Sequence, residues 1–378
     1  MTCINKYCVS IVVVVRNEEK NIESSLKRLV GQTYPGDKYE VIVVDGMSND
    51  GTRDIVKELI RTQHRKIRFV DNSTGRRASG LNIGIRQAKG DIIVRVDART
   101  VLPADYIEKC VNTLVMTGAD NVGGVQRPII NETLRFHSVG GKRREKESGE
   151  GPEECLPDRP GSKLLTQAAI GGAMSHPFGV GNAQFRLGKR SGPVDSVYLG
   201  CFRKEIFQKV GLFDDEAPII TEDSDINYRI RKAGGKVYLN KDIIAYYHPR
   251  DSFEDLYKLY FRYGGARAGF LIKHKKLTSW RQLVAPAFLV VNVMLPVLSI
   301  FDKTLLLFWL VLLGIYTTTD IVVSTYLAHK PAFIIKAGFK RSLFWRFIIT
   351  FPIMHCAWAL GFWKRVLQNP KPGTYWEY

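Results

Sequence analysis

The stretch VIVVDGMSNDGT, residues 41–52, indicates how the first part of this chain folds. Its opening residues are β-branched and apolar, which is typical of a buried strand, and the strand ends in Asp45. Gly46 permits a turn after it, and the SNDGT that follows contains residues that favour turns and helix N-caps. The pattern predicts a strand that leads through a tight loop into a helix and that carries a carboxylate at its tip.

The same pattern recurs along the first hundred residues. Apolar runs alternate with amphipathic stretches, with strands expected at 9–15, 39–44, 67–70 and 92–96 and helices at 20–30, 52–62 and 78–88. Continuous apolar strands between helices indicate an α/β fold with a mostly parallel sheet that helices cover on both faces. Ligands of such sheets bind where the strands end. We therefore expect Asp45 and Asp97, which both end a strand, to mark the functional site.

A second stretch, DIIVRVDART at residues 91–100, ends its strand in Asp97 and has Arg99 two positions later. Two carboxylates at one sheet edge can help to bind a divalent ion and a diphosphate, because Mg²⁺ and Mn²⁺ combine carboxylates with phosphate oxygens. Arg76 and Arg77, at the start of the preceding helix, could contact the same diphosphate. A local salt bridge between Asp97 and Arg99 is the alternative. No G-x-G-x-x-G follows an expected strand, which argues against a dinucleotide-dependent dehydrogenase.

The last third of the sequence has the composition of a membrane domain. Three largely apolar segments, 283–300, 305–327 and 343–363, are each about 20 residues long, which is enough for a helix to cross a bilayer. Aromatic, apolar and basic side chains alternate in the preceding segment and predict amphipathic helices in the membrane interface. The expected organisation is a catalytic domain at 1–250 with a polar, mobile insertion at 140–163, interfacial helices at 251–281, and a membrane domain at 282–378 with two or three transmembrane helices.

The formal net charge of +18 points to an anionic partner. Lys and Arg beside membrane spans are attracted to anionic lipid headgroups, and the sequence has no zinc-finger spacing or RNA-binding signature. We therefore expect membrane lipids as partners and no nucleic acid. The segment between the second and third apolar stretches contains Lys330, Lys336, Lys340 and Arg341. By the positive-inside tendency, we expect a multi-pass protein of the cytoplasmic membrane whose catalytic domain faces the cytosol.

Four motifs occur in order: VSIVVVVRNEEKNI, VIVVDGMSNDGT, ASGLNIGIRQAKGDIIVRVDART and TEDSDINYRIRKAGG. Together they resemble an inverting family 2 glycosyltransferase. Two further stretches, HPFGVGNAQFR and YHPRDSFEDLYKLYFRYGGARA, are similar to the membrane-associated ExoA-type branch of succinoglycan glucosyltransferases. The resemblance covers nearly the whole chain. It implies the GT-A (nucleotide-diphospho-sugar transferase) fold, a Rossmann-like mixed sheet, with an NDP-sugar donor and a divalent cation, Mg²⁺ or Mn²⁺, as cofactor.

The resemblance also implies roles for individual residues. Those that would lie at the nucleoside are Asn17, Glu18 and Asp45. Asp97 would lie at the ribose, the metal or both, and Asp223 would be the catalytic base. Glu222 would support this base or contact the acceptor. On spacing alone, Glu222 and Asp223 could instead be ordinary acids at the N-terminus of a helix.

Arg99 departs from the family pattern, which usually has a second Asp there to give D-x-D. A guanidinium has no lone pair to offer and cannot ligate a metal. Two explanations are open. His248 could complete the metal site together with Asp97, or Arg99 could itself neutralise part of the diphosphate and lower the dependence on the ion.

Two residues outside the main motifs are further candidates. Arg262 lies in FRYGG, where many processive members of the family carry Q-x-x-R-W, and it could bind a phosphate or lie at a lipid headgroup. Without that motif we expect transfer of a single sugar. Asp195 follows the stretch HPFGVGN at 176–182, whose glycines predict a flexible loop that borders the acceptor site.

The expected reaction is transfer of one sugar from an NDP-sugar, a UDP-hexose, to a polyprenyl-linked acceptor in glycan or exopolysaccharide assembly. The acceptor would be a polyprenyl-diphosphate-sugar. If it is instead polyprenyl phosphate itself, the enzyme would make a polyprenyl-phosphate sugar. A catalytically silent membrane scaffold that binds anionic lipid is the alternative from another class of protein.

Overall fold

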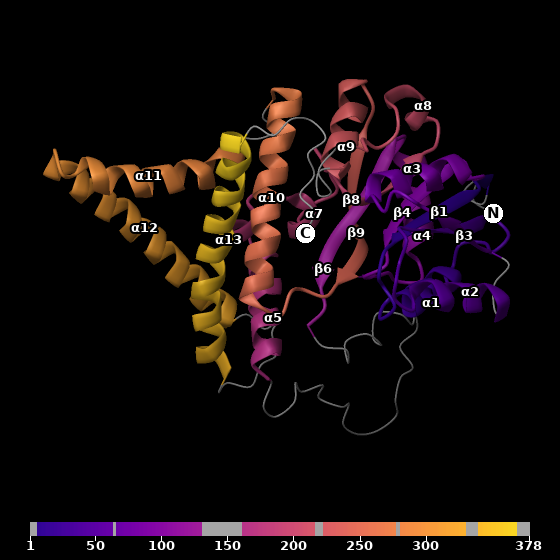
Figure 1. Ribbon diagram of the computed structural model, residues 1–378, viewed down its shortest axis with the longest axis horizontal. Helices are drawn as coiled ribbons and strands as arrows, with labels where there is room; N and C mark the ends of the chain where they lie inside the picture. Colours follow the sequence, from indigo (N-terminus) through magenta and orange to yellow (C-terminus); the bar gives the residue numbers. More distant parts are fainter. Residues whose placement is uncertain are drawn as a thin grey trace. The chain divides into compact units, whose positions relative to one another are not determined.

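The computed structural model describes residues 6–62, 66–130, 161–215, 222–276, 280–329 and 339–368 (Figure 1). The described residues before Pro128, together with those from Ala183 to Tyr247, form one compact unit. Those between Pro128 and Asn182 and those from His248 onward form a second unit. This division differs from the expected domain boundary at 250, because the segment before Asn182 belongs to the second unit. Most of the expected insertion at 140–163 lies outside the described residues.

The first unit is built on one mixed sheet. In the described part of the chain its strands are β1 (Val9–Val15), β2 (Tyr39–Asp45), β3 (Ile67–Asp71), β4 (Ile92–Asp97), β5 (Thr100–Val101), β6 (Asn121–Pro128), β7 (Gly192–Pro193), β8 (Tyr198–Arg203) and β9 (Val237–Tyr247). Their order is β3-β2-β1-β4-β8-β6-β9-β5, with β7 beside β9. The first four strands of this order are parallel, and β8 then joins β4 in the antiparallel direction.

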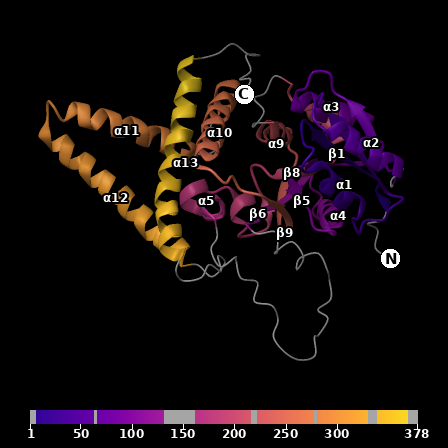
Figure 2. The same ribbon diagram turned by 60° about the horizontal axis from the view of Figure 1, so that its bottom comes forward.

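Helices cover both faces of this sheet, as Figure 2 shows for α1 and α3. The helices of the first unit are α1 (Ile22–Val30), α2 (Thr52–Thr62), α3 (Arg77–Gln87), α4 (Tyr106–Thr117), α7 (Gln184–Leu187), α8 (Ile206–Val210) and α9 (Glu222–Lys232). Alternate residues of β1 face opposite sides, because successive side chains of a strand point to opposite faces. Ile11 and Val13 pack with α1, α2 and α4, whereas Val12 packs with α3, α8 and α9.

The register of the parallel strands brings the two predicted carboxylates to one edge. Val15 of β1 pairs with Asp45 of β2, and the neighbouring Val14 pairs with Asp97 of β4. The expected strands and helices of the first hundred residues are confirmed to within two residues at their ends. The part of the sheet formed after β4 is antiparallel. The mixed sheet that the resemblance implied is therefore confirmed, and it is less parallel than the alternation of strands and helices alone indicated.

The second unit is helical in its described part. It consists of α5 (Ser162–Ala173), α6 (Pro177–Val180), α10 (Phe253–His274), the 3₁₀ helix η3 (Trp280–Leu283), α11 (Val284–Leu298), α12 (Lys303–Ala328) and α13 (Lys340–Gln368). Three segments are long and apolar enough to cross a membrane, namely Trp280–Leu298, Lys303–Ala328 and Lys340–Gln368. Only 6% of the apolar window is buried in each of the first two, against 39% in the third, so most of the apolar surface of α11 and α12 is not covered by described parts of the chain.

The stretch 176–182 was expected to be a flexible loop. It contains the short helix α6, which contacts the long helices of the second unit. The ring centroids of Phe178 and Phe351 are 4.9 Å apart. The backbone carbonyl oxygen of Phe178 lies 2.8 Å from Nε2 of His355. Nδ1 of the same histidine is 2.9 Å from the Tyr316 hydroxyl. These contacts tie α6 to both α12 and α13.

Helices α10 and α13 lie side by side in both views and meet through glycines (Figures 1 and 2). A Cβ added to Gly264 of α10 would lie 1.8 Å from the carbonyl oxygen of Trp358. A Cβ added to Gly361 of α13 would lie 1.9 Å from that of Phe261. Small residues allow the backbones of membrane helices to approach this closely. Residues 251–281 therefore contain a helix that packs along α13, in addition to any interfacial role.

We expect Gly264→Ala to lower the stability of the protein by about 1–3 kcal/mol, because the added methyl group forces the two helices apart. The measurement is thermal unfolding of the detergent-solubilised protein. Gly314→Ala in α12 is the matched control, since an added Cβ there meets nothing within 4 Å. Equal melting temperatures for the two variants would contradict the close packing of α10 against α13.

Candidate active site

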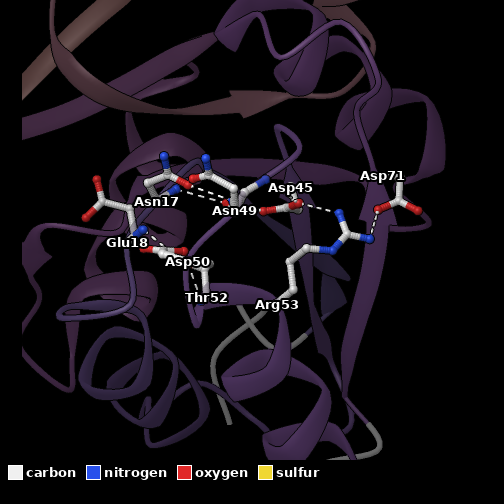
Figure 3. A network of polar contacts seen from close by, with 9 residues as sticks. Asn17, Glu18, Asp45, Asn49, Asp50, Thr52, Arg53 and Asp71 are labelled. Atoms are coloured by element: carbon white, nitrogen blue, oxygen red, sulfur yellow. Dashed lines mark hydrogen bonds and ion pairs between the residues drawn. The ribbon is translucent and has the colours of Figure 1, made fainter.

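Two loops at the edge of the sheet are joined by hydrogen bonds (Figure 3). The first follows β1 and contains Asn17, whose φ of 55° lies in the left-handed region. The Asn17 N–H donates to Oγ of Ser48 at 2.9 Å, and the Asn49 N–H donates to Oδ1 of Asn17 at 3.0 Å. The Glu18 N–H donates to Oγ1 of Thr52 at 2.7 Å. The loop after β1 is therefore fixed to the loop after β2.

Asp45 lies beneath these loops and is fully buried. One carboxylate oxygen accepts from the Ser48 hydroxyl at 2.6 Å, and the other accepts from Nη1 of Arg53 at 2.6 Å. The same guanidinium donates from Nη2 to Asp71 at 2.8 Å, so the arginine links the ends of β2 and β3 (Figure 3). Both Asp45 oxygens thus have partners within the protein, and contact with a nucleoside stays a prediction for this residue.

Arg99 turns to Glu18 rather than to Asp97. Its Nε donates to both carboxylate oxygens of Glu18, at 2.7 and 3.0 Å. The Arg99 side chain is 60% exposed, whereas that of Glu18 is 13% exposed. The local salt bridge between Asp97 and Arg99, which the sequence left open, is therefore wrong, and a largely exposed guanidinium stands at the expected donor edge.

A second cluster combines two arginines and three acids. Arg77 of α3 and Arg95 of β4 both contact Glu222 at the first turn of α9, at 3.4 and 3.2 Å. Arg77 also pairs with Asp97, and Arg95 pairs with Asp223. Arg95 lies 3.5 Å from Asp97 as well. The structure therefore brings Asp97, Glu222 and Asp223 together, which the sequence motifs implied, through two arginines that hold them.

The charges of this cluster are unequal, since three carboxylates face two guanidiniums. Burial would raise the pKa of Asp97, but Arg77 and Arg95 outweigh it and lower this pKa to about 2. Asp223 behaves in the opposite way. Burial, together with the nearby Glu222 and Asp97, raises the pKa of Asp223 to about 7 against the opposing effect of Arg95. One carboxylate of the cluster can thus take up or release a proton near neutral pH.

Glu222 offers one oxygen to a further ligand. Its Oε2 is buried, and no hydrogen-bond partner for it occurs among the described residues. Within that part of the chain no group of three or more His, Cys, Asp or Glu side chains could hold a metal ion. A cation at this cluster would therefore rely on one or two carboxylates and on oxygens of the donor, which is the usual manner of Mg²⁺.

The other predicted residues are not members of the ion pairs that form this cluster in the described part of the chain. Arg76 is exposed at the N-cap of α3. Asp195 pairs at 3.0 Å with Arg231, which is at the opposite end of α9 from Asp223, about 12 Å along the helix. Arg262 is exposed on α10 and His248 begins the second segment of the second unit, so a role at the donor stays a prediction for both.

Arg95 is the residue of this cluster that the sequence motifs did not reveal. Its side chain is only 3% exposed, although it contacts three acids. The signal was one charged residue inside the apolar run IIVRV, between two buried valines. A buried charge is retained only when it is paired, so this position should have been expected to face acids across the sheet.

The comparisons with known proteins agree with this geometry. Residues 10–164 match the model of glycosyl transferase family 2. The chain is 25% identical over 364 residues to the succinoglycan biosynthesis protein ExoA of Rhizobium meliloti, which covers 95% of this chain and 94% of that protein. It is also 25% identical over 365 residues to a dolichyl N-acetyl-α-D-glucosaminyl phosphate 3-β-D-2,3-diacetamido-2,3-dideoxy-β-D-glucuronosyltransferase of Methanococcus voltae, covering 96% of this chain and 98% of that one.

A solved structure shows the same fold. A mannosyltransferase of Pyrobaculum calidifontis, in complex with GDP-Man and Mn²⁺, superposes with a TM-score of 0.57 at 18% identity and covers 96% of this chain and 88% of its own. The mixed sheet with its ligand edge thus defines a GT-A fold. With the family 2 match over residues 10–164 and the two relatives of similar length, the chain is a glycosyltransferase that contains a family 2 domain, and it is a membrane protein.

Proposed function

We propose that this protein is an inverting glycosyltransferase that moves one sugar from an NDP-sugar, a UDP-hexose, to a polyprenyl-linked acceptor. The observation that carries the proposal is the position of Asp223, whose carboxylate is held by Arg95 beside Asp97, where β4 ends. A general base must be held in place and must exchange protons near the working pH, and a pKa of about 7 meets the second requirement.

In the proposed reaction, an acceptor hydroxyl attacks the anomeric carbon of the donor sugar. The hydroxyl proton passes to Asp223 while the bond from the anomeric carbon to the diphosphate oxygen breaks. Attack from the face opposite to the leaving group would convert an α-linked donor into a β-linked product. Arg77 and the exposed Arg99 would offer positive charge to the departing diphosphate. Asn17, Glu18 and Asp45 would shape the nucleoside site through the joined loops.

A divalent cation, Mg²⁺ or Mn²⁺, fits the donor set of the cluster. Its carboxylates exceed its guanidiniums by one, and Oε2 of Glu222 is buried without a partner in the described part of the chain. Asp97 and Glu222 would hold the cation together with oxygens of the donor. The cation would neutralise charge on the leaving diphosphate. His248 stays a proposed additional ligand.

Two observations favour a lipid-linked acceptor. The Methanococcus voltae relative is named for a dolichyl N-acetyl-glucosaminyl phosphate, which is a sugar already linked to a lipid phosphate. The chain also has helices apolar enough to reach such a lipid. We propose a multi-pass protein of the cytoplasmic membrane with its first unit in the cytosol and with an acceptor such as a polyprenyl-diphosphate-sugar. Formation of a polyprenyl-phosphate sugar is the second candidate, because polyprenyl phosphate differs from the lipid-linked sugar for which that relative is named only by the missing sugar.

The test is release of nucleoside diphosphate by the detergent-solubilised protein with a panel of UDP- and GDP-sugars. Each donor is combined with Mg²⁺ or Mn²⁺ and with no acceptor, polyprenyl phosphate or a polyprenyl-diphosphate-sugar. We expect release with one UDP-hexose and only in the presence of a lipid-linked sugar. Release with polyprenyl phosphate would establish the second candidate. Donor binding without release under any condition would point to a silent scaffold instead.

A further inference from the structure

A cavity of about 370 Å³ opens in the second unit, where α5, α10 and α13 meet. Its lining combines hydroxyl groups of Ser162, Thr166 and Ser252 with the guanidinium of Arg346 and the apolar side chains of Trp345 and Ile349. This volume lies within the range of about 300–1,000 Å³ that is usual for small-molecule sites. A lining that combines polar and apolar side chains suits an amphiphilic ligand.

Arg346 is held in place without an acidic partner in the described part of the chain. Its Nε donates to Oγ1 of Thr166 at 3.2 Å, and its Nη2 donates to Oγ of Ser162 at 2.9 Å. Nη1 donates to the carbonyl oxygen of Ser342 at 3.2 Å and to the hydroxyl of the same residue. These partners orient the guanidinium but are all neutral. The positive charge is therefore available to an anion that enters the cavity.

One helix N-terminus adds to this charge. α5 begins at Ser162 with no side-chain cap and no acid in its first turn. The N-terminus of α10 is capped by Ser252 and has Glu254 and Asp255 in its first turn, so it adds no positive charge. Helix N-termini carry partial positive charge and favour phosphate. Asp251 is the one acid of the lining. It favours a ligand that places an anion at Arg346 and a hydroxyl donor elsewhere, as a sugar linked to a phosphate does.

The rim of the cavity carries exposed apolar side chains. Trp345 and Ile349 are one turn apart on α13, and they are 55% and 46% exposed on a helix apolar enough to cross a membrane. An apolar chain attached to the bound phosphate could lie along these two side chains. We propose that the cavity binds the phosphate group of the polyprenyl-linked acceptor, with its chain over Trp345 and Ile349. The identity of this lipid as the acceptor rests on the proposed function.

The test compares Arg346→Gln, Arg346→Lys and the control Arg341→Gln, which changes an exposed arginine of the same helix. Binding of a radiolabelled polyprenyl phosphate to each solubilised variant is measured, with binding of the nucleotide sugar measured by calorimetry. We expect lipid binding to weaken at least about 10-fold in Arg346→Gln, less in Arg346→Lys and not in Arg341→Gln. Donor binding should be the same in all three.

Competition separates the sources of the phosphate. Inorganic phosphate and phosphatidylglycerol vesicles should displace the polyprenyl phosphate only weakly, and Trp345→Ala should weaken lipid binding even if Arg346→Gln does not fold. Unchanged lipid binding in both variants, or equal displacement by phosphatidylglycerol, would overturn the proposal. Lipid binding that depends on Arg346 without turnover would refute the proposed function alone. Turnover with an unchanged acceptor KM in Arg346→Gln would refute this site alone.

Discussion

Replacing Asp223 with Asn is expected to lower kcat by about 10²–10⁴-fold, because an amide of nearly the same shape cannot accept the acceptor's proton. Donor affinity should be almost unchanged, since the charge that faces the diphosphate comes from other residues. Rates of nucleoside-diphosphate release and calorimetry with the donor measure the two quantities. Turnover close to that of the unmodified protein would remove Asp223 from the catalytic role and leave it as an ordinary acid of the α9 N-terminus.

The pH dependence of the same variant provides a second readout. The ionised base is the active form, so the rate of the unmodified enzyme should rise with pH through about 7. Folding raises this pKa from 3.8, so the stability that the protonated group contributes is lost as pH rises from about 4 to 7. Asp223→Asn removes that loss. Its melting temperature should therefore exceed that of the unmodified protein at pH 8, and the difference should be smaller at pH 5.

Replacing Arg95 with Met is expected to destabilise the protein by about 3–5 kcal/mol, because one partner of a buried ionic cluster is lost. Asp97, Glu222 and Asp223 would then share Arg77 alone. Thermal unfolding measures the loss. Arg95 lowers the pKa of Asp223, so its removal should also move the rising limb of the rate profile to higher pH in any variant protein that remains folded.

Two controls make the Arg95 experiment specific. Arg61→Met removes an arginine whose side chain is 75% exposed, and its effect should stay within about 0.5 kcal/mol. Arg95→Lys keeps the charge but loses the forked geometry, and it should recover part of the stability. If Arg95→Met were as stable as Arg61→Met, the cluster would not depend on its buried arginine.

The sequence was sufficient to predict which carboxylates lie at the edge of the sheet. It was not sufficient to predict the ion pairs that these carboxylates form. Asp45 and Asp97 are each the last residue of an apolar run, and the parallel register that such runs adopt places them together. Asp223 and Glu222 were found through the ordered motifs. These features depend on local sequence patterns, which can be recognised in one sequence without homologues.

The ion-pair partners of these side chains could not be predicted from the sequence, because they lie on elements that are distant in the sequence and close only in the folded chain. Arg99 was expected at the diphosphate, with a salt bridge to Asp97 as the alternative, and its side chain pairs with Glu18, which is 81 positions earlier in the chain. Arg95 faces α3 and α9 because it alternates with Val94 and Val96, which pack on the other face. Asp195 pairs with Arg231, a partner that the spacing did not indicate, and its expected place near the acceptor stays a prediction. Each outcome was decided by contacts between elements rather than by spacing.

The bonds between the loops after β1 and β2 have a consequence for chain length. Backbone amides of Asn17, Glu18 and Asn49 each donate to a side chain of the opposite loop. A single inserted or deleted residue in one loop would shift its amides out of reach of the other loop, whatever residue was used. The two loops must therefore keep their lengths, and Asn17, Ser48 and Thr52 must keep a side-chain oxygen within reach of the opposite amide.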